Sequence, residues 1–339
     1  CNGGLVVVEG EKPIRCHNRY GDGTVSVERA IATSCNVALM KMSFAIGKDI
    51  FAVYQQNFNF GLKTNIDLAG EARTAGLVHT ADNMGITELA TGSFGQGFNV
   101  SMIQMITAFS SLVNGGYYYE PHVVKQIRTT SGAVVENIEP RVLKQTISES
   151  TSALLREYCN ATCDPDYTGA TGKKARPAGY AIGGKTGTAQ TIPRGNGEYV
   201  VSFMGYAPAD NPQIAIYVVI DRPNLENQSL GTKCAANIVR EVLTEVLPYM
   251  GIFMTEELSE AERQELEAKK LADTIKYAPV SSGDAQDDQP YVPEDGTVPT
   301  WMTYEKDPAT GCYIEPSTGA LIDPDTGNYV SGEYGAIPE

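Results

Sequence analysis

Three β-type runs follow one another between residues 181 and 221, and they restrict the possible folds more than any other feature of this chain. The runs read "AIGGKTGTAQT", "YVVSFMGYAP" and "QIAIYVVID", and only the short turn segments "PRGNGE" and "ADNP" separate them. Parallel neighbours need a long crossover connection, whereas antiparallel neighbours can be joined by a tight turn. The sequence therefore predicts a three-stranded antiparallel sheet in this region.

Helix-forming patterns lie on both sides of the predicted sheet. Before it, apolar spacing predicts two helices between residues 27 and 44 with "TSCN" near their junction, a third in "FAVYQQNFNFG" and a fourth in "VSMIQMITAFSSLVNGG". One face of the fourth helix holds Ile103, Ile106, Phe109, Ser110 and Val113. After the sheet, "CAANIVREVLTEVLPYM" predicts an amphipathic helix. Its apolar face holds Ile238, Val239, Val242, Leu243, Val246 and Leu247. The fold class is therefore predicted as α+β, an antiparallel sheet flanked by helices.

Two further segments connect these elements. The runs "YYYEPHVVKQIRT" and "VVENI" flank the turn signal "TSGA", which predicts a β-hairpin. The polar stretch from Cys159 to Pro177 is predicted as loop. Beyond Met250, "TEELSEAERQELEAKKLADTI" is polar and rich in helix-forming residues, which indicates a solvated helix.

Charge and composition divide the chain into parts. The 339 residues carry a net charge of −15, of which −11 falls in residues 279–339. This negative charge argues against nucleic acid as a partner and against binding to an anionic membrane surface. We predict a main domain over 1–250, a polar helix over 251–278, an acidic Pro/Gly linker over 279–300 and a tail over 301–339. The tail repeats an octad: "DPATGCYI", "EPSTGALI", "DPDTGNYV".

Cysteine and histidine positions give no indication of a metal site. The seven Cys lack paired C-x-x-C spacing, and His17, His79 and His122 are scattered along the chain. We therefore expect no metal and no cofactor. Cys1 with Cys16, or Cys159 with Cys163, could form disulfides in an oxidising compartment, and free thiols account for the same residues.

The segment "AGYAIGGKTGTAQ" matches two different motifs. From Gly179 to Thr186 it fits the phosphate-loop pattern, and from Lys185 to Thr188 it fits the K-T-G element of serine acyl-transfer enzymes. A phosphate loop needs a buried strand before its first Gly and a helix beginning at its Lys-Thr. Here polar "TGKKARPA" precedes, while β-branched Thr and a Pro follow. The flanks favour a substrate-lining strand, in which Lys185 supplies positive charge, Gly187 permits close approach and the hydroxyls of Thr186 and Thr188 bind a carboxylate.

A second motif, "ATSCNVAL", places Ser34 and Asn36 in an S-x-N arrangement where a helix is predicted to begin. A hydroxyl can relay a proton and an amide can hold a substrate carbonyl. Ser and Asn are also preferred helix caps, which is a purely structural explanation of the same residues. The order of the two motifs, with the predicted sheet around the second, favours the catalytic interpretation.

With these motifs the chain resembles the transpeptidase domain of monofunctional class B penicillin-binding proteins over residues 1–250. The segments "GDGTVSVERAIATSCNVALMKM", "FGLKTNIDLAGE", "SFGQGFNVSMIQMITAFSSLVNGG" and "YVVSFMGYAPADNPQIAIYVVID" carry the likeness in the family's order. The resemblance implies the penicillin-binding transpeptidase and serine β-lactamase-like fold, incomplete at its N-terminus.

The resemblance also implies a chemistry. In this family a Ser attacks a D-Ala-D-Ala stem peptide of peptidoglycan, releases D-alanine and passes the acyl group to an amine. Ser34 would relay a proton, Asn36 would bind the substrate amide, and Lys185 would support the relay. Thr186 and Thr188 would hold the terminal carboxylate, with the Thr188 N–H as an oxyanion donor. The implied partners are stem peptides, β-lactam antibiotics and other cell-wall synthesis proteins, at the extracytoplasmic face of the cell membrane with an anchor upstream.

One element of the family is missing. No Ser in the 339 residues is followed three positions later by Lys, so the S-x-x-K nucleophile is absent. The sequence therefore predicts an N-terminally truncated chain that is inactive by itself. Two alternatives stay open: a hydrolase of the same fold, either a D,D-carboxypeptidase or a β-lactamase, and a non-catalytic scaffold or sensor of the cell-wall machinery.

Overall fold

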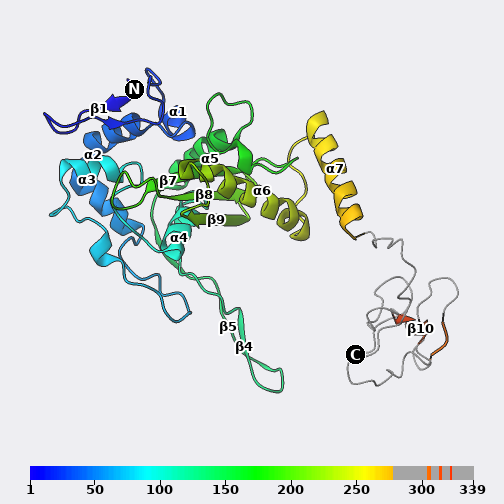
Figure 1. The fold of residues 1–339 in the computed structure, drawn as a ribbon. Helices are drawn as coiled ribbons and strands as arrows, with labels where there is room; N and C mark the ends of the chain where they lie inside the picture. The colour runs from blue at the N-terminus through cyan, green and yellow to red at the C-terminus, as the bar shows by residue number, and fades with distance from the viewer. Residues whose placement is uncertain (278–303, 307–312, 315–320, 323–339) are drawn as a thin grey trace. The chain divides into compact units, whose positions relative to one another are not determined.

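The central element is a three-stranded antiparallel sheet, as the sequence predicts. The computed structural model describes residues 1–277, 304–306, 313–314 and 321–322, and its first compact unit is Cys1–Lys269 (Figure 1). The strands are β7 (Gly183–Gln190), β8 (Tyr199–Ala207) and β9 (Ile214–Asp221), and their order in the sheet is β7-β8-β9. Lys185 pairs with Met204, and Met204 pairs with Tyr217. β8 is therefore the middle strand, and its alternate side chains face two separate hydrophobic layers.

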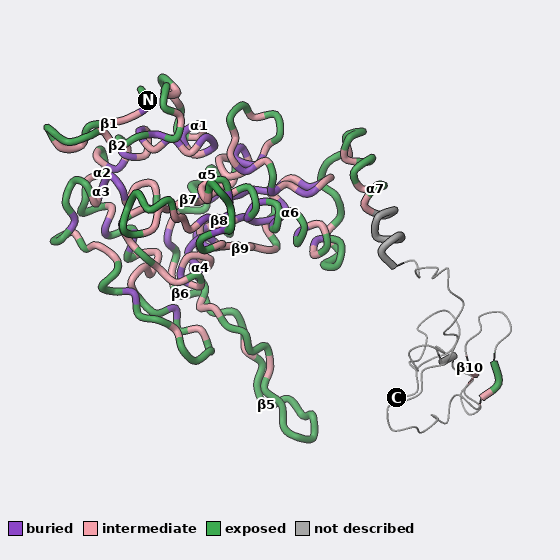
Figure 2. Tube along the Cα trace, in the orientation of Figure 1, coloured by how far each residue is buried: buried purple, intermediate pink, exposed green. Residues whose placement is uncertain are grey.

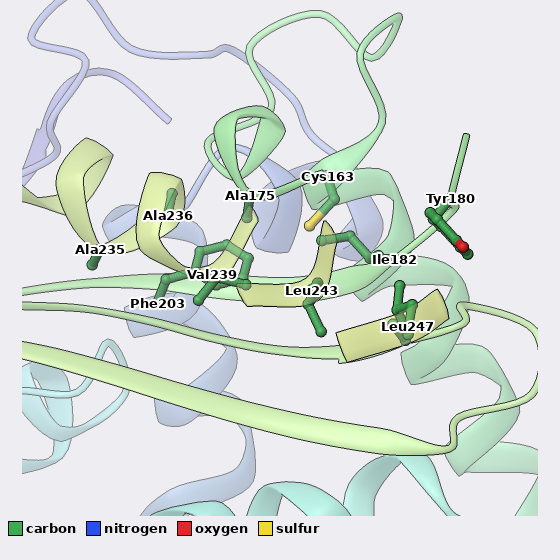
Figure 3. Close-up of a cluster of buried hydrophobic side chains, with 11 residues drawn as sticks. Cys163, Ala175, Tyr180, Ile182, Phe203, Ala235, Ala236, Val239, Leu243 and Leu247 are labelled. Carbon is green, nitrogen blue, oxygen red and sulfur yellow. The ribbon is translucent and has the colours of Figure 1, made fainter. Parts of the chain in front are cut away.

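Helix α6 (Thr232–Tyr249) covers one face of this sheet. Val239, Leu243 and Leu247 are fully buried and belong to the same cluster as Phe203 of β8 (Figure 3). The predicted apolar face was wrong in part, because Ile238 and Val242 are 42% and 38% exposed. Ala235 and Ala236 are buried instead. Small side chains allow a helix to approach a sheet closely. The side of α6 that contacts the sheet is therefore determined by close packing as well as by hydrophobicity.

Helices α4 (Met102–Val113) and α5 (Glu149–Cys163) supply the layer on the other face. Phe109 and Val113 of α4 are buried with Tyr206 of β8, and half-buried Cys159 of α5 packs against this cluster. α4 begins at a capping box in which the Ser101 hydroxyl accepts from the Gln104 N–H and the Gln104 side chain accepts from the Ser101 N–H.

The structure corrects two predictions in this layer. Residues 159–163 are helical rather than loop, because α5 continues to Cys163; only the following stretch is irregular, apart from the 3₁₀ turn η2 (Lys173–Ala175). The predicted apolar face of α4 is also only half correct. Ile103, Ile106 and Ser110 are half-buried, while polar Gln104 is fully buried. Its side chain donates to the Leu62 carbonyl and accepts from the Thr74 hydroxyl, which satisfies its polar atoms without water.

The N-terminal part is helical, as predicted. α1 (Val27–Ala32) and α2 (Asn36–Asn57) are separated by a short turn, and Gly47, with φ of +78°, divides α2 into two helical stretches. α3 (Ile86–Gly92) and the 3₁₀ turn η1 (Ala75–Leu77) follow. Strands β1 (Gly4–Leu5) and β2 (Ile14–Arg15) pair antiparallel ahead of α1.

The predicted hairpin is present and is longer than the sequence indicated. β4 (Gln126–Arg128) pairs with β5 (Val134–Asn137), and at the base β3 (Tyr117–Tyr119) pairs with β6 (Val142–Gln145). Figure 1 shows the β4–β5 ribbon projecting away from the sheet, and every residue of β5 is exposed (Figure 2).

A polar helix follows α6, as predicted, but it is not simply solvated. α7 (Glu260–Tyr277) is preceded by Glu256, which forms an ion pair with Arg176, and Arg176 also pairs with Glu262 at 2.7 Å. The Arg176 and Glu262 side chains are only 15% and 19% exposed. These partly buried ion pairs attach the start of α7 to the segment that leads into β7. The remaining 3₁₀ turn, η3 (Gln228–Gly231), leads into α6.

The described part of the tail contains two strands. β10 (Tyr313–Ile314) and β11 (Leu321–Ile322) pair antiparallel, with Tyr313 opposite Ile322 and Ile314 opposite Leu321. These four residues are the apolar ends of the first two octads, so consecutive repeats pair with each other. The third octad lies outside the described residues. Among the described helices, none is both long and apolar enough to cross a bilayer.

Candidate active site

Lys185 and Ser34 meet in space, although 151 residues separate them in the chain. Lys185 lies in β7, and its Nζ donates to the Ser34 Oγ at 3.0 Å. The same ammonium group also donates to the Thr186 carbonyl at 3.1 Å and contacts the Thr186 hydroxyl at 3.4 Å. The tertiary structure therefore joins the two motifs that the sequence separates.

Ser34 lies in the turn between α1 and α2, and it does not cap a helix. Cys35 is the N-cap residue of α2, and its side chain makes no capping hydrogen bond. Ser34 has φ of +54°, a left-handed conformation that is unfavourable for residues with a side chain. A strained backbone conformation persists only where surrounding contacts stabilise it, and such conformations are most common at functional sites. The purely structural capping explanation for Ser34 is therefore wrong.

Asn36 is the first residue of α2, two positions after Ser34. Its Nδ2 donates to the Arg15 carbonyl of β2 at 3.2 Å. Asn36 is near Ser34 because only one residue separates them in the sequence. Its side-chain amide, however, is hydrogen-bonded to the N-terminal strand pair. Among the described residues, no hydrogen bond joins the side chains of Asn36 and Lys185.

Thr186 and Thr188 each have a hydroxyl partner that the sequence did not predict. The Thr186 hydroxyl donates to the Thr171 hydroxyl at 3.0 Å, and Thr171 itself donates to the Ala32 carbonyl through its N–H at 3.1 Å. The Thr188 hydroxyl lies 2.7 Å from the Thr232 hydroxyl at the start of α6. A pattern search finds neither Thr171 nor Thr232, because each comes from a segment that only the fold places beside β7.

The strand interpretation of "GGKTGTAQ" is confirmed. β7 runs through all eight residues, so Lys185 and Thr186 lie inside a strand and not at a helix N-terminus, where a phosphate loop would need them. Gly187 has a packing reason of its own. A Cβ at this position would lie 2.4 Å from the Ser202 Oγ of the neighbouring strand β8. A larger residue here would therefore force the Ser202 hydroxyl to rotate away, so glycine leaves this hydroxyl in place besides any access it gives to a substrate.

The electrostatics of Lys185 suit proton transfer near neutral pH. Burial lowers the pKa of its ammonium group from 10.5 to about 8, because the charged form loses hydration. Cys159 and Cys163 on α5 lie nearby, and burial raises the pKa of the Cys159 thiol to about 11, so that this neighbour stays neutral at pH 7. A lysine with this pKa can exchange a proton with the Ser34 hydroxyl close to the working pH of an enzyme.

The lowered pKa of Lys185 predicts a measurable dependence of stability on pH. Between about pH 8 and pH 10.5 the unfolded lysine keeps its proton while the folded one has lost it, so stability from this group rises with pH. We expect the free energy of unfolding of the wild type, relative to Lys185→Met, to increase by on the order of 2 kcal/mol across this range. Urea unfolding of both proteins at a series of pH values measures it. A difference that stays constant with pH would contradict the lowered pKa.

The structure also gathers residues that the sequence left scattered. Cys1, Cys16, Asp22 and Cys35 lie together, with their ligand atoms all within 4.8 Å of one another. Cys35 is the central residue of the S-x-N motif. The six cysteines that the structure describes all carry free thiols, so neither Cys1 and Cys16 nor Cys159 and Cys163 form a disulfide.

Comparison with known proteins agrees with this arrangement. The family model "penicillin binding protein transpeptidase domain" matches residues 4–244. Stage V sporulation protein D of Bacillus subtilis is 37% identical over 253 residues, covering 74% of this chain and 38% of that protein. The probable peptidoglycan D,D-transpeptidase PenA of Neisseria gonorrhoeae is 28% identical over 255 residues, covering 74% of this chain and 41% of that protein. The chain therefore spans about two fifths of the length of these curated relatives.

A solved structure shows the same fold. Penicillin-binding protein 3 of Mycobacterium tuberculosis, complexed with aztreonam, superposes with a TM-score of 0.65 at 24% identity, covering 75% of this chain and 58% of that one. The likeness covers the α+β architecture of sheet and flanking helices that surrounds Lys185. Together with the family match over residues 4–244, it shows that this chain belongs to the penicillin-binding protein transpeptidase family.

Proposed function

We propose that this chain contributes the sheet side of a serine D,D-transpeptidase active site that cross-links peptidoglycan. The observation that carries the proposal is the 3.0 Å hydrogen bond between the Lys185 Nζ and the Ser34 Oγ, within a fold of the transpeptidase family. Ser34 holds a strained backbone conformation at this contact. Such a contact supports a catalytic site over a scaffold, because a scaffold has no need for a strained serine against a half-buried lysine.

The chemistry assigns a role to each residue. A Ser nucleophile attacks the carbonyl of the penultimate D-alanine, its proton passes through Ser34 to the leaving amine, and free D-alanine departs. An amine of a second strand then attacks the acyl-enzyme and regenerates the serine. Lys185 supports the relay and supplies positive charge, and Asn36 binds the substrate amide. Thr186 and Thr188 bind the terminal carboxylate, and the Thr188 N–H donates to the oxyanion.

The ligands follow from the same chemistry. The stem peptide ends in D-Ala-D-Ala, and β-lactams acylate the same serine because they present a reactive amide in the same position. The relative from M. tuberculosis is complexed with the β-lactam aztreonam, and PenA is named as a probable D,D-transpeptidase, which supports an amine rather than water as the acceptor. This activity places the protein at the extracytoplasmic face of the cell membrane. The division into a transpeptidase domain over 1–250, a polar helix, a linker and a repeat tail stays a prediction.

The S-x-x-K nucleophile is absent from the 339 residues, so we expect them alone to form no covalent penicillin adduct. The same polypeptide joined to a family S-x-x-K segment should become labelled by a fluorescent penicillin and should release D-alanine from a D-Ala-D-Ala peptide. Gel fluorescence and intact mass measure the adduct. Excess unlabelled penicillin is the control for specific labelling. Labelling of residues 1–339 alone would contradict the expected inactivity, and a nucleophile-containing protein that neither labels nor releases D-alanine would contradict the proposed function.

A further inference from the structure

A four-residue cluster beside the proposed active site has the composition of a metal centre. It contains the thiols of Cys1, Cys16 and Cys35 and the carboxylate of Asp22. Cys16 and Cys35 are 1% and 0% exposed, while Cys1 and Asp22 are half-buried. The Sγ atoms of Cys16 and Cys35 are 3.9 Å apart. Ligand atoms about 2.3 Å from a tetrahedral zinc ion lie roughly 3.8 Å from one another, so this pair already has the required spacing.

The backbone around the cluster holds three separate segments together. The Cys16 N–H donates to the Gly3 carbonyl at 2.9 Å, which sets Cys16 beside the N-terminus. The Gly23 N–H donates to the Cys1 carbonyl at 3.0 Å, which brings the Asp22 segment to Cys1. A Cβ at Gly21 would lie 2.2 Å from that same Cys1 carbonyl. Only glycine therefore permits the close approach of these two segments.

The two remaining ligands are also oriented. The Asn18 Nδ2 donates to the Asp22 Oδ1 at 2.9 Å, which leaves the second carboxylate oxygen available as a ligand. The Cys35 N–H donates to the Ala30 carbonyl at 2.8 Å at the end of α1. Metal ligands are commonly held in this way by hydrogen bonds from neighbouring groups.

We propose that Cys1, Cys16, Cys35 and Asp22 bind one Zn²⁺ ion. Three thiolates and one carboxylate form a soft, four-coordinate donor set, which suits zinc rather than calcium or magnesium. Binding replaces three S–H protons, which pass to solvent, and needs no oxidant or reductant. Cys35 lies between Ser34 and Asn36, so a zinc–sulfur bond at Cys35 fixes the S-x-N turn to the N-terminal strands.

The test uses the full 339-residue chain, reduced and kept without oxygen, with Zn²⁺ as the probe. We expect one equivalent of zinc per chain by mass spectrometry of metals, and cobalt substitution should give sulfur-to-metal charge-transfer bands. Cys35→Ser should abolish tight binding. Asp22→Asn keeps all three thiols but removes a charged ligand, so it should lower affinity by at least the roughly 10- to 100-fold that loss of a group supporting a ligand costs. Cys234→Ser is the matched control, because Cys234 is exposed on α6 and outside the cluster, and it should bind like the wild type.

The opposing outcomes are distinct. Zinc binding that is unchanged in Cys35→Ser would place the ion elsewhere, for example on the acidic tail, and would overturn the proposal. Absence of zinc from the reduced wild type, or a Cys16–Cys35 disulfide that forms under the same conditions and blocks the metal, would also overturn it. Circular dichroism of Asp22→Asn separates lost binding from lost folding. None of these measurements depends on penicillin labelling, so the zinc proposal and the proposed function can fail independently.

Discussion

Replacing Lys185 by Met is expected to slow acylation of the nucleophile-containing protein by a fluorescent penicillin by about 10²- to 10⁴-fold. The physical reason is the removal of the only group that donates to the Ser34 hydroxyl among the described contacts, together with its positive charge next to the K-T-G strand. The side chain of Met has a similar length, so the variant keeps most of the packing around β7. Single-turnover labelling measures the rate, and thermal unfolding shows whether the fold is intact.

Two controls make this result specific. Lys174→Met removes an exposed lysine of the 3₁₀ turn η2, outside β7, and should leave the acylation rate unchanged. The acylation rate of the wild type should also fall as pH passes through about 8, where Lys185 loses its positive charge, and the variant should lack this fall. Equal acylation rates in wild type and Lys185→Met would show that the contact with Ser34 has no part in the reaction.

Replacing Leu243 by Ala is expected to destabilise the fold by about 2–5 kcal/mol. Leu243 is fully buried between α6 and the sheet, where it belongs to the cluster that contains Phe203 and Val239. Truncation removes buried methyl groups and leaves a cavity that close-packed neighbours fill only in part. Urea unfolding followed by circular dichroism measures the change in free energy.

Ile238→Ala on the same helix is the matched control. Ile238 carries the same number of side-chain carbons but is 42% exposed, so its truncation should cost clearly less than that of Leu243. Ala has a higher helix propensity than both residues, with a larger gain over β-branched Ile than over Leu, but this difference is only a few tenths of a kcal/mol, so the comparison mainly reports burial. A larger loss for Ile238→Ala than for Leu243→Ala would contradict the packing of α6 against the sheet.

The parts of the fold that the sequence predicted correctly are those with strong local signals. Short turns between β-type runs allowed only antiparallel pairing of β7, β8 and β9, and the turn residues around 129–133 predicted the β4–β5 hairpin. Helices α2, α4 and α6 were found because their apolar spacing is helical. Turn residues and apolar spacing are recognised within a short segment of sequence, and no contact between segments far apart in the chain is needed to interpret them.

The errors arose where packing decides. The segment from residue 159 was predicted as loop, although Ser148 caps α5 by accepting from the Thr151 N–H at 3.1 Å, a signal that the sequence did contain. The buried face of α4 includes Gln104, because this side chain finds three partners inside the fold. Ile238 was assigned to the apolar face of its helix and is 42% exposed, because hydrophobicity indicates the general side of a helix but not which positions touch the sheet.

The amino-acid sequence alone determined the sheet, the two motifs and the family resemblance, because each depends on residue order within short segments. Only the tertiary structure decided that Lys185 contacts Ser34 and that Ser34 caps no helix. The proximity of Cys1, Cys16, Asp22 and Cys35 is likewise visible only in the tertiary structure. These residues lack any spacing typical of zinc sites, because two backbone hydrogen bonds and the close approach at Gly21 bring them together. Long-range proximity depends on how distant segments pack, and no local pattern encodes it.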